Sequence, residues 1–106
     1  MKVWLDDVRD PPDAGWVWVR TAPTAIQALC TRAVNEISLD HDLGPAGSGC
    51  GNGYDVLLAM EEAASRGDFS FIPASIHIHT ANPVAQKRME AARASIRRIC
   101  ARGPRP

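Results

Sequence analysis

The sequence predicts one α/β domain with a mainly parallel sheet covered by helices on both faces. The main observation is that short apolar, β-branched segments alternate along the chain with segments whose apolar residues recur every three or four positions. The second is that 106 residues with 45% apolar side chains suit a single core, and no repeat divides them. We therefore expect one domain over residues 1–102 and a frayed tail over 103–106.

Four segments are expected to form strands, because each is short, rich in aromatic or β-branched residues and bounded by turn residues. The connection from Val8 to Gly15 is too short for the usual helical crossover between parallel strands. Either an irregular loop makes this crossover, or the first two strands run antiparallel. The expected strands are residues 3–5, 16–20, 36–41 and 75–80.

Three segments are expected to form helices. The first spans residues 25–34, with Thr21 or Thr24 as its N-cap, and the second runs from Gly53 to Gly67. The third begins at Asn82-Pro83, which supplies an N-cap followed by proline at the first helical position. The expected inner faces are Ile26, Leu29, Cys30 and Ala33; Val56, Leu57, Met60 and Ala64; and Met89, Ala92, Ile96 and Ile99.

Several classes of protein are excluded by composition. No apolar run approaches the roughly 18 residues of a membrane span, and the acidic Asp6-Asp7 comes too early for a secretory signal, so we expect the cytoplasm. The glycine-rich segment 43–52 lacks the pattern of a P-loop and is interpreted as a flexible loop. The cysteines have no metal-type spacing and are expected to be reduced thiols: Cys30, Cys50 and Cys100.

The net charge of zero conceals a division along the chain. Residues 1–69 carry five basic and eleven acidic side chains, a net charge of −6, whereas residues 70–106 carry seven basic and one acidic, a net charge of +6. Such a division suits either the attraction of an anionic partner or a solvated basic face on the last helix.

Acidic and histidine side chains gather at the expected ends of three strands, where open α/β sheets bind their ligands. Asp6 and Asp7 follow the first strand and Asp40 lies at the end of the third, so the three carboxylates suit a hard divalent cation such as Mg²⁺ or Mn²⁺. His77 and His79, two apart on the fourth strand, point to the same side. They would bind a softer metal or act as acid and base on a phosphate ester, although His77 also suits a structural role in the core.

The turn into the last helix is a natural seat for a phosphate. Main-chain N–H groups near Thr80 and Asn82 combine there with the positive end of the helix dipole. Arg88, one turn further, would close over the anion or turn to solvent. His41 follows Asp40 directly, so their side chains leave opposite faces of a strand, and His41 either joins the site or misses it.

Five motifs span nearly the whole chain: LDDVR (5–9), WVWVRTA (16–22), ISLDHDLG (37–44), GYDVL (53–57) and HIHTANPV (77–84). Together they resemble the cyclic-phosphate processing receiver-like domain, a divergent group of response-regulator receivers. The resemblance implies a small flavodoxin-like, three-layer sandwich of about four mostly parallel strands and three helices, without the usual first helix and fifth strand. It places the acidic pair at Asp6 and Asp7, the phosphoacceptor position at Asp40 and the switch threonine at Thr80.

The resemblance and the histidines predict a phosphoesterase for a cyclic phosphate, carried by a nucleotide or by an RNA end as a 2′,3′-cyclic phosphate. The alternative is a non-catalytic, degenerate receiver that binds a nucleotide or a partner protein. Phosphotransfer signalling is not expected, because the receiver lysine that contacts the phosphoryl group is absent. In the hydrolase hypothesis the catalytic residues are His79, His77, Asp40 and His41, the phosphate-binding residues are Thr80, Asn82 and Arg88, and the metal ligands are Asp6, Asp7 and Asp40.

Overall fold

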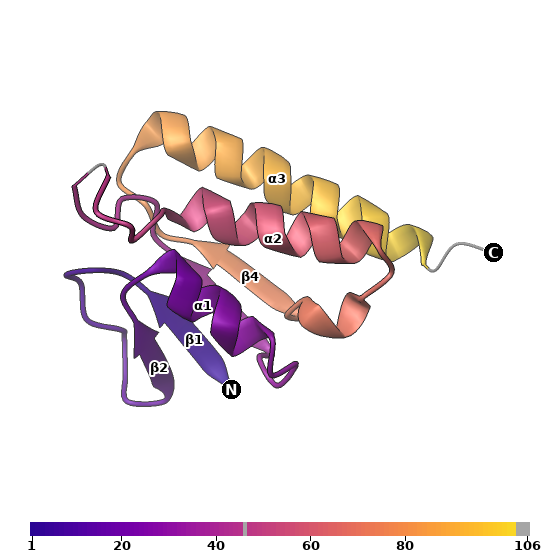
Figure 1. Cartoon of the computed structure of the whole chain (residues 1–106), viewed down its shortest axis with the longest axis horizontal. Coiled ribbons are helices and arrows are strands. Elements are labelled where there is room, and N and C mark those ends of the chain that lie inside the picture. The colour runs from indigo at the N-terminus through magenta and orange to yellow at the C-terminus, as the bar shows by residue number, and fades with distance from the viewer. Residues whose placement is uncertain (46, 104–106) are drawn as a thin grey trace.

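The computed structural model describes residues 1–45 and 47–103, and the expected tail at 104–106 lies outside them. Within this part of the chain, one sheet of four parallel strands has the order β2-β1-β3-β4 (Figure 1). The elements are β1 (Lys2–Leu5), β2 (Trp16–Val19), α1 (Ala22–Leu29), β3 (Glu36–Leu39), α2 (Gly53–Ser65), the 3₁₀ helix η1 (Phe69–Phe71), β4 (Ser75–Ile78) and α3 (Pro83–Arg102). The predicted α/β fold, with four strands and three helices, is confirmed.

Strands β1 and β2 are parallel, with Val3 opposite Val17, so the antiparallel alternative is wrong. An irregular loop makes the crossover. It is held against the sheet because the indole Nε1 of Trp4 donates to the main-chain oxygen of Arg9 at 2.9 Å. The main-chain nitrogen of Asp6 donates to the main-chain oxygen of Val19 at 3.1 Å, so the pairing of β1 with β2 continues beyond the end of β1.

All three helices lie on one face of the sheet, as Figure 1 shows. The inward residues of the strands, such as Leu5 and Ile37, share one core with Leu29 of α1, Leu57 of α2 and Met89 of α3. The chain moves from β1 to β2 in one direction across the sheet and from β2 to β3 and β4 in the other. Since crossovers between parallel strands are right-handed, connections made in opposite directions lie on opposite faces of the sheet. The loop between β1 and β2 is therefore on the second face, and it is too short for a helix. The described chain thus has two layers where the sequence predicts three.

Helix α1 begins and ends earlier than the expected span of 25–34. Its N-cap is Thr21, whose side chain accepts from the main-chain nitrogen of Thr24 at 3.2 Å. The chain cannot continue as a helix through Arg32, because this residue has a φ of 59°, in the left-handed region. The expected inner face is wrong at Cys30 and Ala33, which are exposed. The buried residues are Ala22, Ala25 and Leu29.

The N-terminus of α3 follows the expected capping chemistry, and α2 has a capping box that was not predicted. Asn52 and Asp55 form a reciprocal capping box at 3.0 Å in both directions. Asn82 accepts from the main-chain nitrogen of Ala85 at 3.1 Å. The expected inner faces of both helices are buried, except that Ile99 near the end of α3 is only half-buried. None of the described helices has the length and apolarity needed to cross a membrane.

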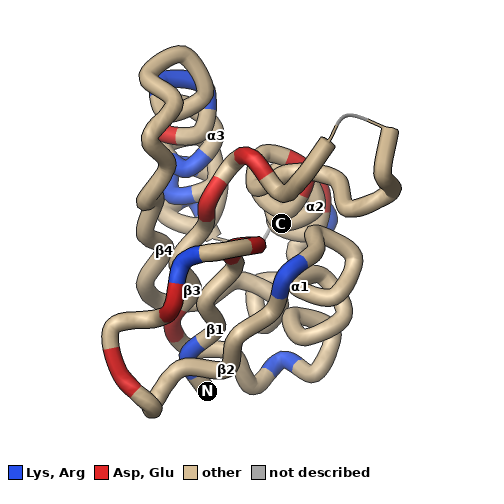
Figure 2. Tube along the Cα trace, turned by 90° about the vertical axis from the view of Figure 1, so that its left-hand side faces the viewer, with Lys and Arg blue, Asp and Glu red and all other residues tan. Residues whose placement is uncertain are grey.

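The basic residues from Lys87 to Arg102 lie along α3, as the blue bands in Figure 2 show. Arg97 and Arg98 are exposed, opposite the buried stripe that includes Met89 and Ile96. Arg93 is half-buried and donates to the main-chain oxygen of Ile76 at 3.0 Å. This pattern is that of an amphipathic helix with a solvated basic face.

Strands β3 and β4 each end two residues earlier than expected, at Leu39 and Ile78. The polar residues that follow therefore lie in loops at the carboxyl edge of the sheet. Gly53 brings the start of α2 close to this edge, because a Cβ there would overlap the main-chain oxygen of Asp40 and lie 2.8 Å from Cε of Met89. Only glycine permits this close approach.

Candidate functional site

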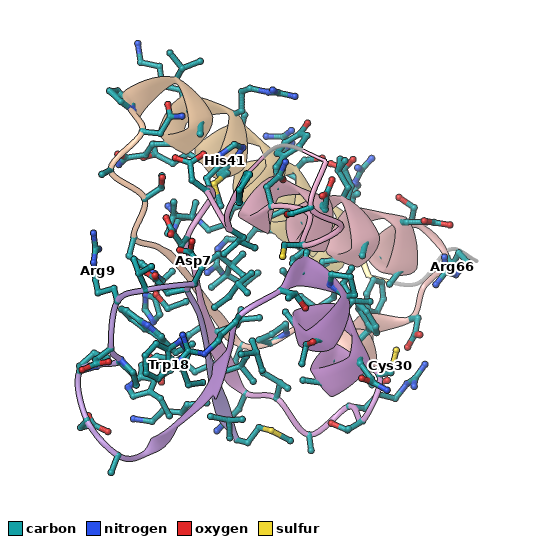
Figure 3. All side chains as sticks on the ribbon, turned by 60° about the vertical axis from the view of Figure 1, so that its left-hand side comes forward. Asp7, Arg9, Trp18, Cys30, His41 and Arg66 are labelled. Carbon is teal, nitrogen blue, oxygen red and sulfur yellow. The ribbon has the colours of Figure 1, made fainter. Side chains whose placement is uncertain are left out.

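Three carboxylates converge at the carboxyl edge of the sheet. Asp6, Asp7 and Asp40 each offer one oxygen, and these oxygens lie within 4.8 Å of one another. The sheet brings them together because β1 and β3 are neighbours, and the main-chain nitrogen of Asp40 donates to the oxygen of Leu5 at 2.9 Å. Asp6 is 1% exposed, whereas Asp7 and Asp40 are half-buried. Figure 3 labels Asp7 at this edge.

The imidazole of His79 is held on three sides beside these carboxylates. Its Nε2 lies 3.0 Å from Oδ2 of Asp6 and its Nδ1 lies 2.7 Å from Oγ of Ser38. The indole of Trp4 stacks on the ring, with centroids 3.9 Å apart and planes 3° apart. The side chain is 14% exposed. His79 therefore has one defined orientation.

The hydrogen-bond partners assign the tautomer of His79. An ionised carboxylate only accepts, so Nε2 carries the hydrogen and donates to Asp6, whereas Nδ1 accepts from the hydroxyl of Ser38. Burial lowers the pKa of His79 below its ordinary value, and the charge of Arg9 adds to this, despite the opposing effect of Asp6. The ring is therefore neutral at neutral pH.

The carboxylates of Asp6 and Asp40 have opposite pKa shifts. Burial raises the pKa of Asp6, but the N–H groups of Arg9 and Val8, which donate to Oδ1 at 2.8 and 2.9 Å, and the contact with His79 outweigh it, so its pKa is lowered. The pKa of Asp40 is raised, first by burial and then by the charge of Asp6. Asp40 is thus the carboxylate whose ionisation is disfavoured by its surroundings.

The three aspartates fit a hard divalent cation. Carboxylate oxygens are the ligands that Mg²⁺ and Mn²⁺ prefer. A carboxylate oxygen has two lone pairs, so Oδ2 of Asp6 keeps one beyond the bond from His79. The repulsion from Asp6 and Asp7 that raises the pKa of Asp40 is relieved when a cation lies between them.

The predicted phosphate-binding residues lie in the loop before α3, at its N-cap and in its second turn. The main-chain nitrogen of Asn82 donates to Oγ1 of Thr80 at 3.2 Å, which leaves the Thr80 hydroxyl hydrogen free for another partner. The side-chain oxygen of Asn82 caps α3. Arg88 is exposed, in agreement with the second of its two expected orientations, and its guanidinium lies over the ring of Tyr54, 4.5 Å from the centroid.

The other two histidines contact different carboxylates. Nε2 of His77 lies 2.8 Å from Oε2 of Glu36, and its side chain is 53% exposed. Nδ1 of His41 lies 2.8 Å from Oδ1 of Asp42. The structure therefore brings the imidazole of His79, but not that of His77 or His41, into hydrogen-bond contact with the three-aspartate cluster. His41 contacts the cluster only through its main-chain nitrogen, which donates to Oδ1 of Asp40 at 2.9 Å.

Sequence reasoning missed four residues that shape this site. Ser38 and Trp4 each lie two positions before an aspartate, and period-2 alternation would have placed them on the face of that aspartate. Nη1 of Arg9 donates to the main-chain oxygen of His79 at 3.2 Å, and Nη1 of Arg20 donates to that of Asp7 at 2.8 Å. No local pattern indicates these two long-range contacts.

A parallel sheet with an acidic pair after β1, an aspartate after β3 and a threonine after β4 defines a receiver-like domain. The model of the cyclic-phosphate processing receiver domain family matches residues 1–95. The chain belongs to this family, as the resemblance of its motifs predicts. No curated protein and no solved structure matches the chain.

Proposed function

We propose that this domain is a phosphoesterase that hydrolyses a cyclic phosphate carried by a nucleotide or by an RNA end. The observation that carries the proposal is the placement of His79 between Asp6 and Ser38, beside the three-aspartate cluster. A fixed imidazole and a cluster of oxygen ligands are the two components of metal-assisted hydrolysis of phosphate esters.

His79 is the proposed general base. Its Nδ1 is the nitrogen that carries a lone pair, and the hydroxyl of Ser38 links this nitrogen to a water molecule that attacks the phosphorus atom. As the water gives a proton to Oγ, Ser38 passes its own proton to Nδ1. The carboxylate of Asp6 then stabilises the imidazolium through Nε2.

The other residues hold the cation and the phosphate. Asp6, Asp7 and Asp40 are the proposed ligands of a divalent cation, which when bound polarises a phosphoryl oxygen and neutralises its charge. The hydroxyl of Thr80 donates to a second phosphoryl oxygen, and the positive end of α3 lies beside it. Water adds to phosphorus, one phosphorus–oxygen ester bond breaks, and the released oxygen takes the proton held by the imidazolium of His79, so a phosphate monoester results and His79 is neutral again.

The test is hydrolysis of 2′,3′-cyclic AMP and of an oligoribonucleotide with a 2′,3′-cyclic phosphate end, with Mg²⁺ or Mn²⁺, followed by phosphorus NMR. We expect His79→Ala and Asp40→Ala each to lower kcat/KM by about 100-fold or more. Asp68→Asn is the matched carboxylate control, because Asp68 pairs with Arg32 at 2.7 Å, away from the strand ends. Equal rates in the wild type and the His79→Ala variant would contradict the proposal.

A non-catalytic binding module is the second candidate. It is favoured by the fact that both ring nitrogens of His79 and the side-chain oxygen of Asn82 already have partners within the chain. In that case the wild type binds the cyclic nucleotide, detected by the fluorescence of Trp4 on His79, and yields no product over hours.

A further inference from the structure

Three arginines lie near the candidate site, and two of them are held by aromatic rings. The guanidinium of Arg20 lies 3.9 Å from the ring centroid of Trp18, and that of Arg88 lies 4.5 Å from the ring centroid of Tyr54. Arg9 has neither an aromatic partner nor an ion pair among the described residues. Its one hydrogen bond from the side chain goes to the main-chain oxygen of His79. Four of its five N–H donors are therefore free for a ligand.

The backbone that carries Arg9 is fixed on both sides. Its main-chain nitrogen donates to Oδ1 of Asp6 at 2.8 Å, and its main-chain oxygen accepts from Nε1 of Trp4 at 2.9 Å. These two partners are also the residues that hold the imidazole of His79. The same contacts thus position both the imidazole of His79 and the backbone from which the Arg9 side chain extends.

The guanidinium of Arg9 extends from the loop after β1 to the end of β4, where its Nη1 lies 3.2 Å from the main-chain oxygen of His79. Figure 3 labels Arg9 and Asp7 at this edge of the molecule. Arg9 is exposed, and its guanidinium lies next to His79, the residue before Thr80. A planar group with several free N–H donors at such a place matches the oxygens of a phosphate.

Charge gives this position a specific role. A phosphate that approaches His79 also approaches the carboxylates of Asp6, Asp7 and Asp40, which repel it. A divalent cation offsets part of that repulsion, and the guanidinium of Arg9 beside His79 offsets a further part. Because Arg9 forms no ion pair with a carboxylate in the part of the chain that the structure describes, its charge is available to the ligand.

We propose that Arg9 binds the phosphate of the substrate directly, beside His79 at the end of β4. The inference rests on the proposed function for the identity of the substrate. It adds a phosphate-binding residue that motif spacing did not indicate. The ligand class it selects is an anionic phosphate ester with at least two unesterified oxygens, which includes a cyclic phosphodiester, since the fork of Arg9 pairs with charged oxygens.

The experiment compares Arg9→Gln and Arg9→Lys with Arg93→Gln. Arg93 is the matched control because it also donates through Nη1 to a main-chain oxygen of β4, that of Ile76, and lies on α3. Two quantities are measured with Mg²⁺ present: the Kd of inorganic phosphate from tryptophan fluorescence, and kcat and KM for 2′,3′-cyclic AMP.

We expect Arg9→Gln to raise the Kd of phosphate and the KM of the cyclic nucleotide by about 10- to 100-fold, the range for loss of a charge-assisted hydrogen bond. Arg9→Lys should recover part of both, and Arg93→Gln should change neither by more than about twofold. Unchanged binding and KM in Arg9→Gln would overturn this inference while the proposed function stands. A wild type that binds phosphate in an Arg9-dependent manner without hydrolysis would overturn the proposed function alone, and one that neither binds nor hydrolyses would overturn both.

Discussion

The imidazole of His79 and the carboxylate of Asp6 are 73 positions apart in the chain, yet Nε2 and Oδ2 lie 3.0 Å apart. Asp6 follows β1 and His79 follows β4, and β3 lies between these two strands. The ring reaches across β3 by accepting from Ser38, which is part of that strand. One side chain thus connects the ends of three strands, and this arrangement is the basis of the predictions below.

His77, in β4, and His79, directly after it, should differ in importance. We expect His77→Ala to change kcat/KM by no more than about twofold, because loss of an exposed side-chain contact has little effect. His77 is 53% exposed and contacts Glu36 rather than the three-aspartate cluster. Steady-state kinetics on 2′,3′-cyclic AMP, beside His79→Ala, provides the measurement. A loss in His77→Ala as large as that in His79→Ala would show that the base has been assigned to the wrong ring.

The stability of the fold should depend on the protonation of His79. Its pKa is lowered in the folded state by burial, so the unfolded chain binds the proton more readily. The contribution of neutral His79 to the free energy of unfolding is therefore complete above 6.5, the ordinary pKa of histidine. It is lost as the pH falls below that value towards the lower pKa of His79 in the folded protein. Thermal unfolding from pH 7.5 to 5.0 should show this decline in the wild type and a weaker decline in His79→Gln. Parallel curves for the two proteins would contradict the expectation.

Asp40→Asn should stabilise the protein in the absence of metal. The raised pKa of Asp40, caused by burial and by Asp6, means that its ionised form is unfavourable in the folded state at neutral pH. We expect a higher Tm than that of the wild type in EDTA. Mg²⁺ at about 100 times its Kd should stabilise the wild type by about 2.7 kcal/mol and the variant by much less. Equal Mg²⁺-induced shifts in Tm would remove Asp40 from the set of ligands.

Gly53→Ala should destabilise the fold by about 3 kcal/mol, because overpacking against a rigid backbone forces a shift. The added Cβ would overlap the main-chain oxygen of Asp40. Gly67→Ala is the control: a Cβ there has no neighbour within 4 Å, but the φ is +81°. Gly67→Ala should lower the free energy of unfolding by only about 1–2 kcal/mol, because a left-handed backbone is its only source of strain. Urea denaturation measures both, and a Gly53→Ala cost at or below that of Gly67→Ala would contradict the packing argument.

The sequence alone determined the alternation of strands and helices, the cap of α3 at Asn82 and the location of the acidic residues at strand ends. These features depend on spacing within a short segment, which periodicity and capping chemistry describe. The end of α1 was not predicted, because the left-handed backbone of Arg32 leaves no trace in the apolar spacing. Local spacing can therefore predict that a segment is helical even where it cannot predict the residue at which the helix ends.

The tertiary structure decided what lies together. It set the parallel direction of β2, the placement of all three helices on one face, and the choice of His79 over His77 as the partner of Asp6. It also brought Arg9 to the end of β4. The physical reason is that contacts between strands depend on sheet order and register, and these are set by the packing of the whole core rather than by the spacing of residues within any one segment.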